Sequence, residues 1–191
     1  MSALVRPLSK PATITFGIGS ALGAIACGYV GYRIVFSSFA TYDDEGYFLV
    51  SIQEWLDRGQ LYDGVYSEYG PGYFTLVGGL FGALGGDVDH DTARLITLGI
   101  WLAVSVLAGL SLLRLTGNPL IALAGQLLAF VVLVIMHQDP MYPGAWLALV
   151  LIAIPAAVAF LLPTRPALGM FSIGALRRSR PWSRSTSEAL P

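Results

Sequence analysis

The chain has 191 residues, of which 55% are hydrophobic and only 12% are charged, and its formal net charge is −1. A water-soluble domain carries about twice that charged fraction. Together with a mean hydropathy of +0.67, this composition excludes a soluble globular protein. The single cysteine, Cys27, lies in an apolar run, which excludes a disulfide framework and a cysteine metal site.

Four apolar runs are each close to the roughly 20 residues that cross a bilayer as a helix. Arg6 and Lys10 precede the first run, as in a signal peptide, and Ser38-Phe39-Ala40 resembles a cleavage site. That run is longer than the 7–15 residues of a typical signal core, so we expect an uncleaved helix. The sequence therefore predicts an all-α polytopic membrane protein with about four transmembrane helices, at residues 12–39, 95–113, 120–136 and 145–162.

The charges separate onto the two sides of this four-helix arrangement. The positive-inside rule counts the basic residues and predicts that both termini are cytoplasmic. The expected location of the protein is the plasma membrane. The basic side carries Arg6, Lys10, Arg114, Arg165, Arg177, Arg178, Arg180 and Arg184. The acidic side carries Asp43, Asp44, Glu45, Glu54, Asp57, Asp63, Glu68, Asp87, Asp89, Asp91 and Asp139.

Residues 40–94 form one large loop on the predicted non-cytoplasmic side. Within Glu45–Arg58, apolar residues recur at helical spacing, which predicts an amphipathic helix at the outer interface; Ser51 is expected on its polar face. Tyr73–Leu84 is apolar but too short to cross, so we expect an interfacial or re-entrant helix. The organisation is therefore a cytoplasmic N-terminus (1–11), a transmembrane region (12–162) and a disordered cytoplasmic tail (163–191).

Three acids follow the first apolar run in Thr41-Tyr42-Asp43-Asp44-Glu45-Gly46-Tyr47. One interpretation is helix capping, since Thr41 with Asp44 three residues later fits a capping pattern. The other is a carboxylate held at the membrane surface as a general base or metal ligand. His137 and Asp139 supply at most two further ligands, so no cofactor is predicted with certainty and a divalent metal stays open.

The same region resembles the N-terminal part of GT-C glycosyltransferases. The matching features are Asp44-Glu45 directly after the first span, the amphipathic helix, Tyr69-Gly70-Pro71-Gly72-Tyr73, and Ala93-Arg94-Leu95 at the start of the second span. The resemblance covers about residues 16–162. These enzymes are polytopic and use polyprenyl-phosphate-linked sugars, and they include protein O-mannosyltransferases and aminoarabinose transferases.

The resemblance implies that Asp44 is the catalytic base, with Glu45 beside it. It also implies that Arg94 meets the departing lipid phosphate, although an arginine at this level also serves as an interface anchor. Tyr69 and Tyr73 are candidate substrate-binding residues; the alternative for these tyrosines, and for Trp55 and Trp101, is the aromatic belt at the membrane surface.

The expected partners are membrane lipid and a polyprenyl-phosphate-linked sugar, not nucleic acid. GT-C enzymes generally carry seven or more spans, so the chain is expected to be a truncated product or to act with a second polypeptide that supplies further spans. Two other classes stay open, a non-catalytic membrane subunit and a small transporter component. The second to fourth apolar runs carry no charge, which disfavours the transporter.

Overall fold

A computed structural model describes residues 8–37, 44–58, 69–85, 88–136 and 139–161. Within these ranges the chain is helical and contains no strand, which confirms the predicted all-α class. The helices are α1 (Lys10–Ser37), α2 (Glu45–Arg58), α3 (Pro71–Leu84), α4 (His90–Thr116), α5 (Pro119–Met136) and α6 (Pro143–Leu161).

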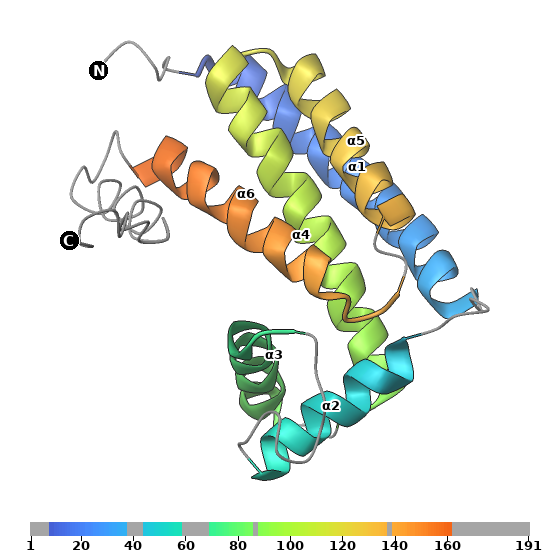
Figure 1. Cartoon of the computed structure of the whole chain (residues 1–191). Helices are drawn as coiled ribbons and strands as arrows, with labels where there is room; N and C mark the ends of the chain where they lie inside the picture. Colours follow the sequence, from blue (N-terminus) through green and yellow to red (C-terminus); the bar gives the residue numbers. More distant parts are fainter. Residues whose placement is uncertain (1–7, 38–43, 59–68, 86–87, 137–138, 162–191) are drawn as a thin grey trace, which may run out of the picture.

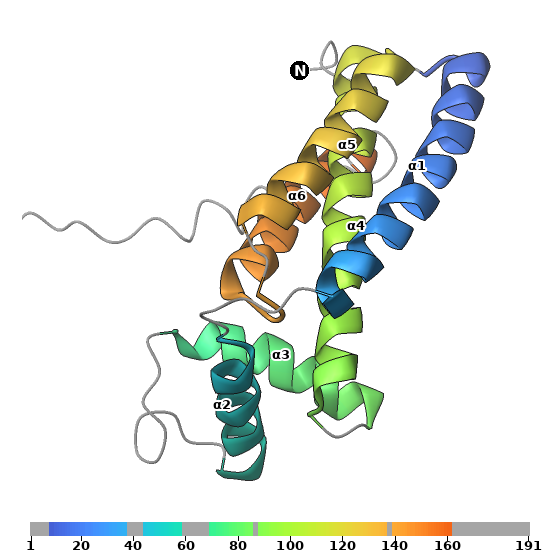
Figure 2. The same ribbon diagram turned by 90° about the vertical axis from the view of Figure 1, so that its right-hand side faces the viewer.

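The four helices α1, α4, α5 and α6 form an elongated bundle in which α4 contacts each of the other three (Figures 1 and 2). In the described part of the chain, α1, α4 and α5 are each long and apolar enough to cross a membrane. The fourth expected span corresponds to α6, a 19-residue apolar helix that packs along α4. The membrane character of the fold is thus confirmed, while a fourth crossing stays a prediction.

Helix α4 begins five residues before the predicted apolar run because Asp89 caps it. The Asp89 carboxylate accepts hydrogen bonds from the backbone N–H of Thr92, at 2.9 Å, and from the Thr92 hydroxyl, at 2.6 Å. These bonds hold the pKa of Asp89 below its usual value. Gly117 ends the helix in the left-handed conformation, at φ 67°. The resulting 27 residues span about 40 Å, so α4 extends beyond the roughly 30 Å hydrocarbon core.

Helices α2 and α3 form a separate layer at the end of the bundle where α4 begins (Figure 1). The bounds of α2 agree with the predicted amphipathic helix, and its apolar face is buried against protein, with Phe48 and Ile52 fully covered. The expectation for Ser51 was wrong: its side chain is only 1% exposed. Ser51 lies beside the apolar face of α2, and α2 packs against both α3 and α4.

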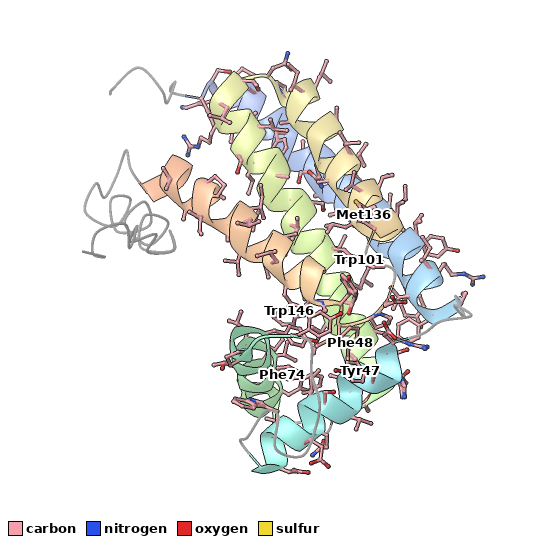
Figure 3. All side chains as sticks on the ribbon, viewed as in Figure 1. Tyr47, Phe48, Phe74, Trp101, Met136 and Trp146 are labelled. Atoms are coloured by element: carbon pink, nitrogen blue, oxygen red, sulfur yellow. The ribbon has the colours of Figure 1, made fainter. Side chains whose placement is uncertain are left out.

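One further interpretation from the sequence needs correction. Trp101 does not lie in a surface belt, because it is fully buried within the bundle with its ring centroid 6.4 Å from that of Phe130 (Figure 3). Gly78 allows close packing, since a Cβ there would lie 2.9 Å from the Trp55 ring. At Gly79 and Gly82 of the same helix, an added Cβ would meet no atom within 4 Å.

Candidate functional site

The two neighbouring carboxylates at the start of α2 lie in opposite environments. Asp44 is exposed, and its backbone carbonyl accepts the hydrogen bond of the Phe48 N–H at 3.0 Å, so α2 begins there. The Glu45 side chain is only 1% exposed. Consecutive helical residues are about 100° apart around the axis, so burial of Glu45 directs Asp44 outward. Of this acidic pair, Asp44 is the carboxylate that a substrate can reach.

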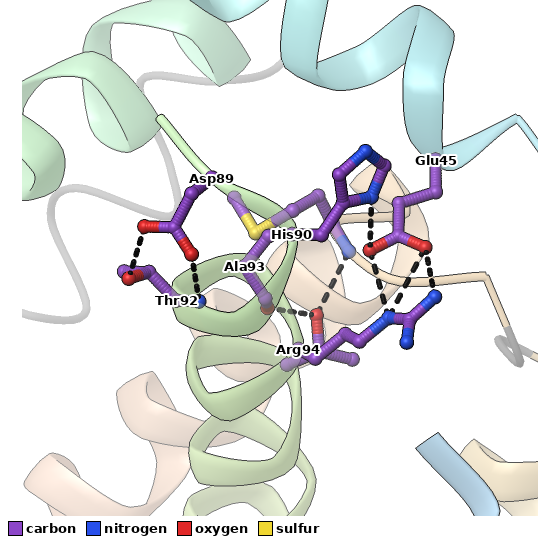
Figure 4. Close-up of polar contacts among 8 residues, drawn as sticks. Glu45, Asp89, His90, Thr92, Ala93 and Arg94 are labelled. Carbon is purple, nitrogen blue, oxygen red and sulfur yellow. Dashed lines mark hydrogen bonds and ion pairs between the residues drawn. The ribbon is translucent and has the colours of Figure 1, made fainter. Parts of the chain in front are cut away.

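Glu45 is held by Arg94 in a bidentate ion pair that joins α2 to α4 (Figure 4). The Arg94 Nε donates to Glu45 Oε1 at 3.0 Å and to Oε2 at 3.2 Å, and Nη2 donates to Oε2 at 2.8 Å. On the solvent side, His90 Nδ1 lies 3.1 Å from Oε1. The Arg94 guanidinium also lies over the ring of Phe36 in α1, 5.8 Å from its centroid. Arg94 therefore links three helices.

This arrangement changes what Arg94 and Glu45 can do chemically. The Glu45 carboxylate is buried and both of its oxygens are bound to a guanidinium, so it is not open to a substrate. The Arg94 side chain is 18% exposed, so it is less deeply buried than its partner. The pair is best suited to fix the first turn of α2, and with it Asp44, against the end of the bundle. A simple interface anchor would not require a buried carboxylate partner.

A second junction fixes α3 and α4 to the turn between α5 and α6. The Tyr73 hydroxyl donates to the Met141 carbonyl at 2.7 Å, and the Met141 N–H donates to Thr97 Oγ1 at 2.8 Å. Met141 is 1% exposed and has a positive φ of 64°, which is strained for a residue with a side chain. Burial, and to a lesser degree the neighbouring Tyr69, raises the pKa of Tyr73, so this phenol stays protonated as a donor.

Tyr69 and Tyr73 lie together at a groove between α3 and α6. The groove has a volume of about 480 Å³, and Trp146 of α6 lines it as well. Phe48 of α2 connects this groove to the acidic pair, because its ring centroid lies 5.4 Å from that of Tyr69 and 6.3 Å from that of Tyr73. Phe48 is one helical turn after Asp44. The candidate base and the two tyrosines thus belong to the same end of the molecule.

The metal hypothesis and part of the capping hypothesis involve residues outside the described ranges. These are Thr41, Asp43 and His137. Among the residues that the structure describes, no three His, Cys, Asp or Glu side chains lie close enough together to hold a metal ion. Asp139 packs half-buried in the turn before α6.

Three residues at these junctions were not identified from the sequence, namely Thr97, Met141 and Trp146. Thr97 and Met141 lie far apart in the chain and meet only because α4 crosses the α5–α6 turn. Asp139-Pro140 indicates a turn, but no sequence signal marks Met141 as the strained position. Trp146 lies in an apolar run in which any large side chain fits the pattern.

Comparisons of the chain with protein-family models, curated proteins and solved structures gave no match.

Proposed function

We propose that the protein is a membrane glycosyltransferase of the GT-C type, acting alone or with a second polypeptide. It would transfer a sugar from a polyprenyl-phosphate donor to an acceptor on the non-cytoplasmic side of the plasma membrane. The observation that carries the proposal is the arrangement of Asp44 and Glu45 at the end of the helix bundle. Glu45 is buried in an ion pair with Arg94, and this ion pair fixes the neighbouring Asp44, whose carboxylate is exposed.

In the proposed reaction, Asp44 takes the proton of an acceptor hydroxyl. The acceptor oxygen then forms a bond to the anomeric carbon of the sugar, and the bond between that carbon and the phosphate oxygen breaks. Polyprenyl phosphate leaves with the bonding electrons. An exposed carboxylate at the membrane boundary suits this step, because the head group of a lipid-linked sugar lies at the same level.

Arg94 and Glu45 take different parts in this scheme. Glu45 is a positioning residue, which acts on Asp44 by fixing the first turn of α2 through Arg94. The partly exposed Arg94 side chain is the proposed contact for the leaving phosphate, at a reduced net charge because Glu45 neutralises it.

The groove between α3 and α6 is the proposed position of the donor next to the base. Its lining is mainly apolar and aromatic, with Tyr69, Tyr73, Leu76, Trp146 and Val150 among its residues. Apolar walls suit the first isoprenoid units, and aromatic rings suit the apolar face of a sugar. The Tyr73 hydroxyl is already used by Met141, so Tyr73 would contribute its ring rather than its hydroxyl.

A non-catalytic subunit is the second candidate function, and exposed apolar side chains favour it. Val50 of α2 is 60% exposed and Leu76 of α3 is 51% exposed, so this layer offers a surface for another protein or for lipid. In that case the carboxylate of Asp44 would have no chemical role.

The two candidates differ in an assay of sugar transfer from labelled polyprenyl phosphate. Membranes would come from cells that lack the native chain and express either the wild type or a variant. The enzyme hypothesis predicts that transfer is restored by the wild type and not by Asp44→Asn, while Val50→Ser retains it. The subunit hypothesis predicts that Asp44→Asn restores transfer fully and that Val50→Ser does not.

A further inference from the structure

Met141 connects the two walls of the groove between α3 and α6. Tyr73 and Leu76 belong to the α3 wall, and Trp146 and Leu147 belong to the α6 wall. Met141 lies in the turn directly before α6. Its carbonyl accepts the hydrogen bond of the Tyr73 hydroxyl at 2.7 Å. This bond therefore joins the α3 wall to the turn from which the α6 wall starts.

Both backbone polar groups of Met141 are held by side chains from other helices. Besides the carbonyl, which is bound by Tyr73 of α3, the Met141 N–H donates to Thr97 Oγ1 of α4 at 2.8 Å. The φ of Met141 is 64°, in the left-handed region that residues with a Cβ avoid. Such a conformation persists only where the surroundings impose it. Loss of either hydrogen bond would therefore favour the return of Met141 to an ordinary φ.

The α6 wall has a second unfavourable feature, at Trp146. This side chain is 9% exposed, and its indole Nε1–H is buried without a hydrogen-bond partner in the part of the chain that the structure describes. A buried donor without an acceptor is unfavourable, because it has lost its hydrogen bond to water. Met141 and Trp146 both lie around the start of α6, so a movement of this segment would relieve both features.

We propose that the start of α6 is a movable wall of this groove, with Met141 as its hinge and the Tyr73–Met141 hydrogen bond as its latch. While the latch holds, Met141 stays left-handed and the Trp146 indole stays buried. When the latch opens, Met141 relaxes, the start of α6 moves away from α3, and the indole N–H becomes accessible to an oxygen atom of a ligand. Because Tyr73 also lines the groove, a ligand that fills the groove contacts the latch directly.

The polyprenyl-phosphate donor is the ligand that this movement would admit, and that assignment rests on the proposed function. The movement itself does not, since hinge and latch are properties of the chain alone. The closest packing of α3 is with α2 and not with α6, so the two walls can separate while α3 keeps its neighbour. A measurement without donor therefore tests the hinge separately from sugar transfer, and loss of the catalytic role of Asp44 would leave its result unchanged.

Electron paramagnetic resonance can measure the separation of the two walls in the purified full chain in nanodiscs. Spin labels at Ala83→Cys in α3 and Leu151→Cys in α6, in a Cys27→Ala background, report this distance. Both positions are exposed and neither is among the residues that line the groove. The short distance belongs to the latched state and a longer distance to the released state.

Removal of either hydrogen bond should release the latch. Tyr73→Phe and Thr97→Val each leave a buried backbone group of Met141 without its partner, so each should raise the population at the longer distance at least about fivefold. Thr97→Ser keeps the hydroxyl and should give the wild-type distances. Thr75→Val, which removes an exposed α3 hydroxyl that bonds within its own helix, should do the same.

Two substitutions of Met141 separate backbone strain from loss of the side chain. Met141→Gly and Met141→Ala both remove the buried side chain, but only glycine adopts the left-handed conformation without a steric cost. The ratio of short-distance to long-distance population should therefore be at least about fivefold higher in Met141→Gly than in Met141→Ala. Equal ratios in these two variants would overturn the proposal, as would unchanged distances in Tyr73→Phe and Thr97→Val. Circular dichroism checks that each variant is folded, and if Met141→Ala is not, the comparison of Thr97→Val with Thr97→Ser decides.

Discussion

The Glu45–Arg94 ion pair should control how firmly α2 is held on the bundle. The Glu45 carboxylate is almost completely buried, and both of its oxygens accept hydrogen bonds from Arg94. Removal of one partner from such a pair leaves a buried charge uncompensated and costs about 3–5 kcal/mol. Glu45→Gln removes the carboxylate charge at nearly constant shape, and Arg94→Met keeps most of the apolar stem. We expect either variant to release α2.

Local opening of α2 can be measured by thiol modification at a Ser51→Cys variant in a Cys27→Ala background. The Ser51 side chain is only 1% exposed, so a water-soluble reagent modifies this position only when α2 leaves its place. A loss of about 3 kcal/mol corresponds to a modification rate at least about a hundredfold faster. The variant with both Glu45→Gln and Arg94→Met should lose less stability than the sum of the single variants.

His90→Ala is the control for this experiment. Its side chain also contacts the Glu45 carboxylate but is 62% exposed, so its removal should change the modification rate by less than about fivefold. A modification rate for Glu45→Gln equal to that of the starting protein would refute the reasoning. So would strictly additive losses in the double variant.

Three further predictions follow from the same geometry. Tyr73→Phe leaves the buried Met141 carbonyl without its donor and should lower the free energy of unfolding in denaturant by about 1–3 kcal/mol. An unchanged denaturation midpoint would contradict the hydrogen bond between Tyr73 and Met141. Gly78→Leu would clash with Trp55 and should alter tryptophan fluorescence, whereas Gly82→Leu enters open space and should not; equal spectra would count against the α2–α3 packing. Hydrogen bonds from Thr92 lower the pKa of Asp89. The cap therefore stabilises α4 fully when the pH is above the unfolded-state pKa of an aspartate. This stabilisation is lost as the pH falls through the lower folded-state pKa of Asp89. Asp89→Ala should therefore reduce the thermal midpoint at neutral pH and not in strong acid, and a loss that is independent of pH would be evidence against a charged cap.

The helices could be predicted from the sequence because their signals are local. An apolar run of sufficient length defines a membrane helix, and the spacing of Phe48, Leu49 and Ile52 defined α2 with the bounds that the structure has. The other predicted bounds differ from the structure by at most three residues, and the start of α4 differs by five. This larger difference arises because the Asp89 cap extends the helix through a polar turn that hydropathy does not detect.

The partners within the site could not be predicted, since they depend on how the helices cross. Asp44 and Glu45 are equivalent as a sequence pattern, and burial alone distinguishes them. Arg94 was expected to face a phosphate or the head groups, but the pairing with Glu45 follows from the position of α2 across the beginning of α4. The prediction that Ser51 is exposed was wrong for the same reason. A helical period in the sequence identifies one apolar face, but it does not show how many neighbouring helices cover the rest of the helix.

Turnover by Asp44→Asn is the measurement that tests the proposed catalytic role most directly. It would be compared with Asp57→Asn, which changes an exposed aspartate at the other end of α2 that is bonded to Gln53. Loss of a general base predicts that sugar transfer from polyprenyl phosphate falls by about 10²–10⁴-fold in Asp44→Asn, while Asp57→Asn and the membrane insertion of both variants stay normal. Full transfer activity of Asp44→Asn would contradict the account and would leave Asp44 with only the role of the residue that precedes and caps α2.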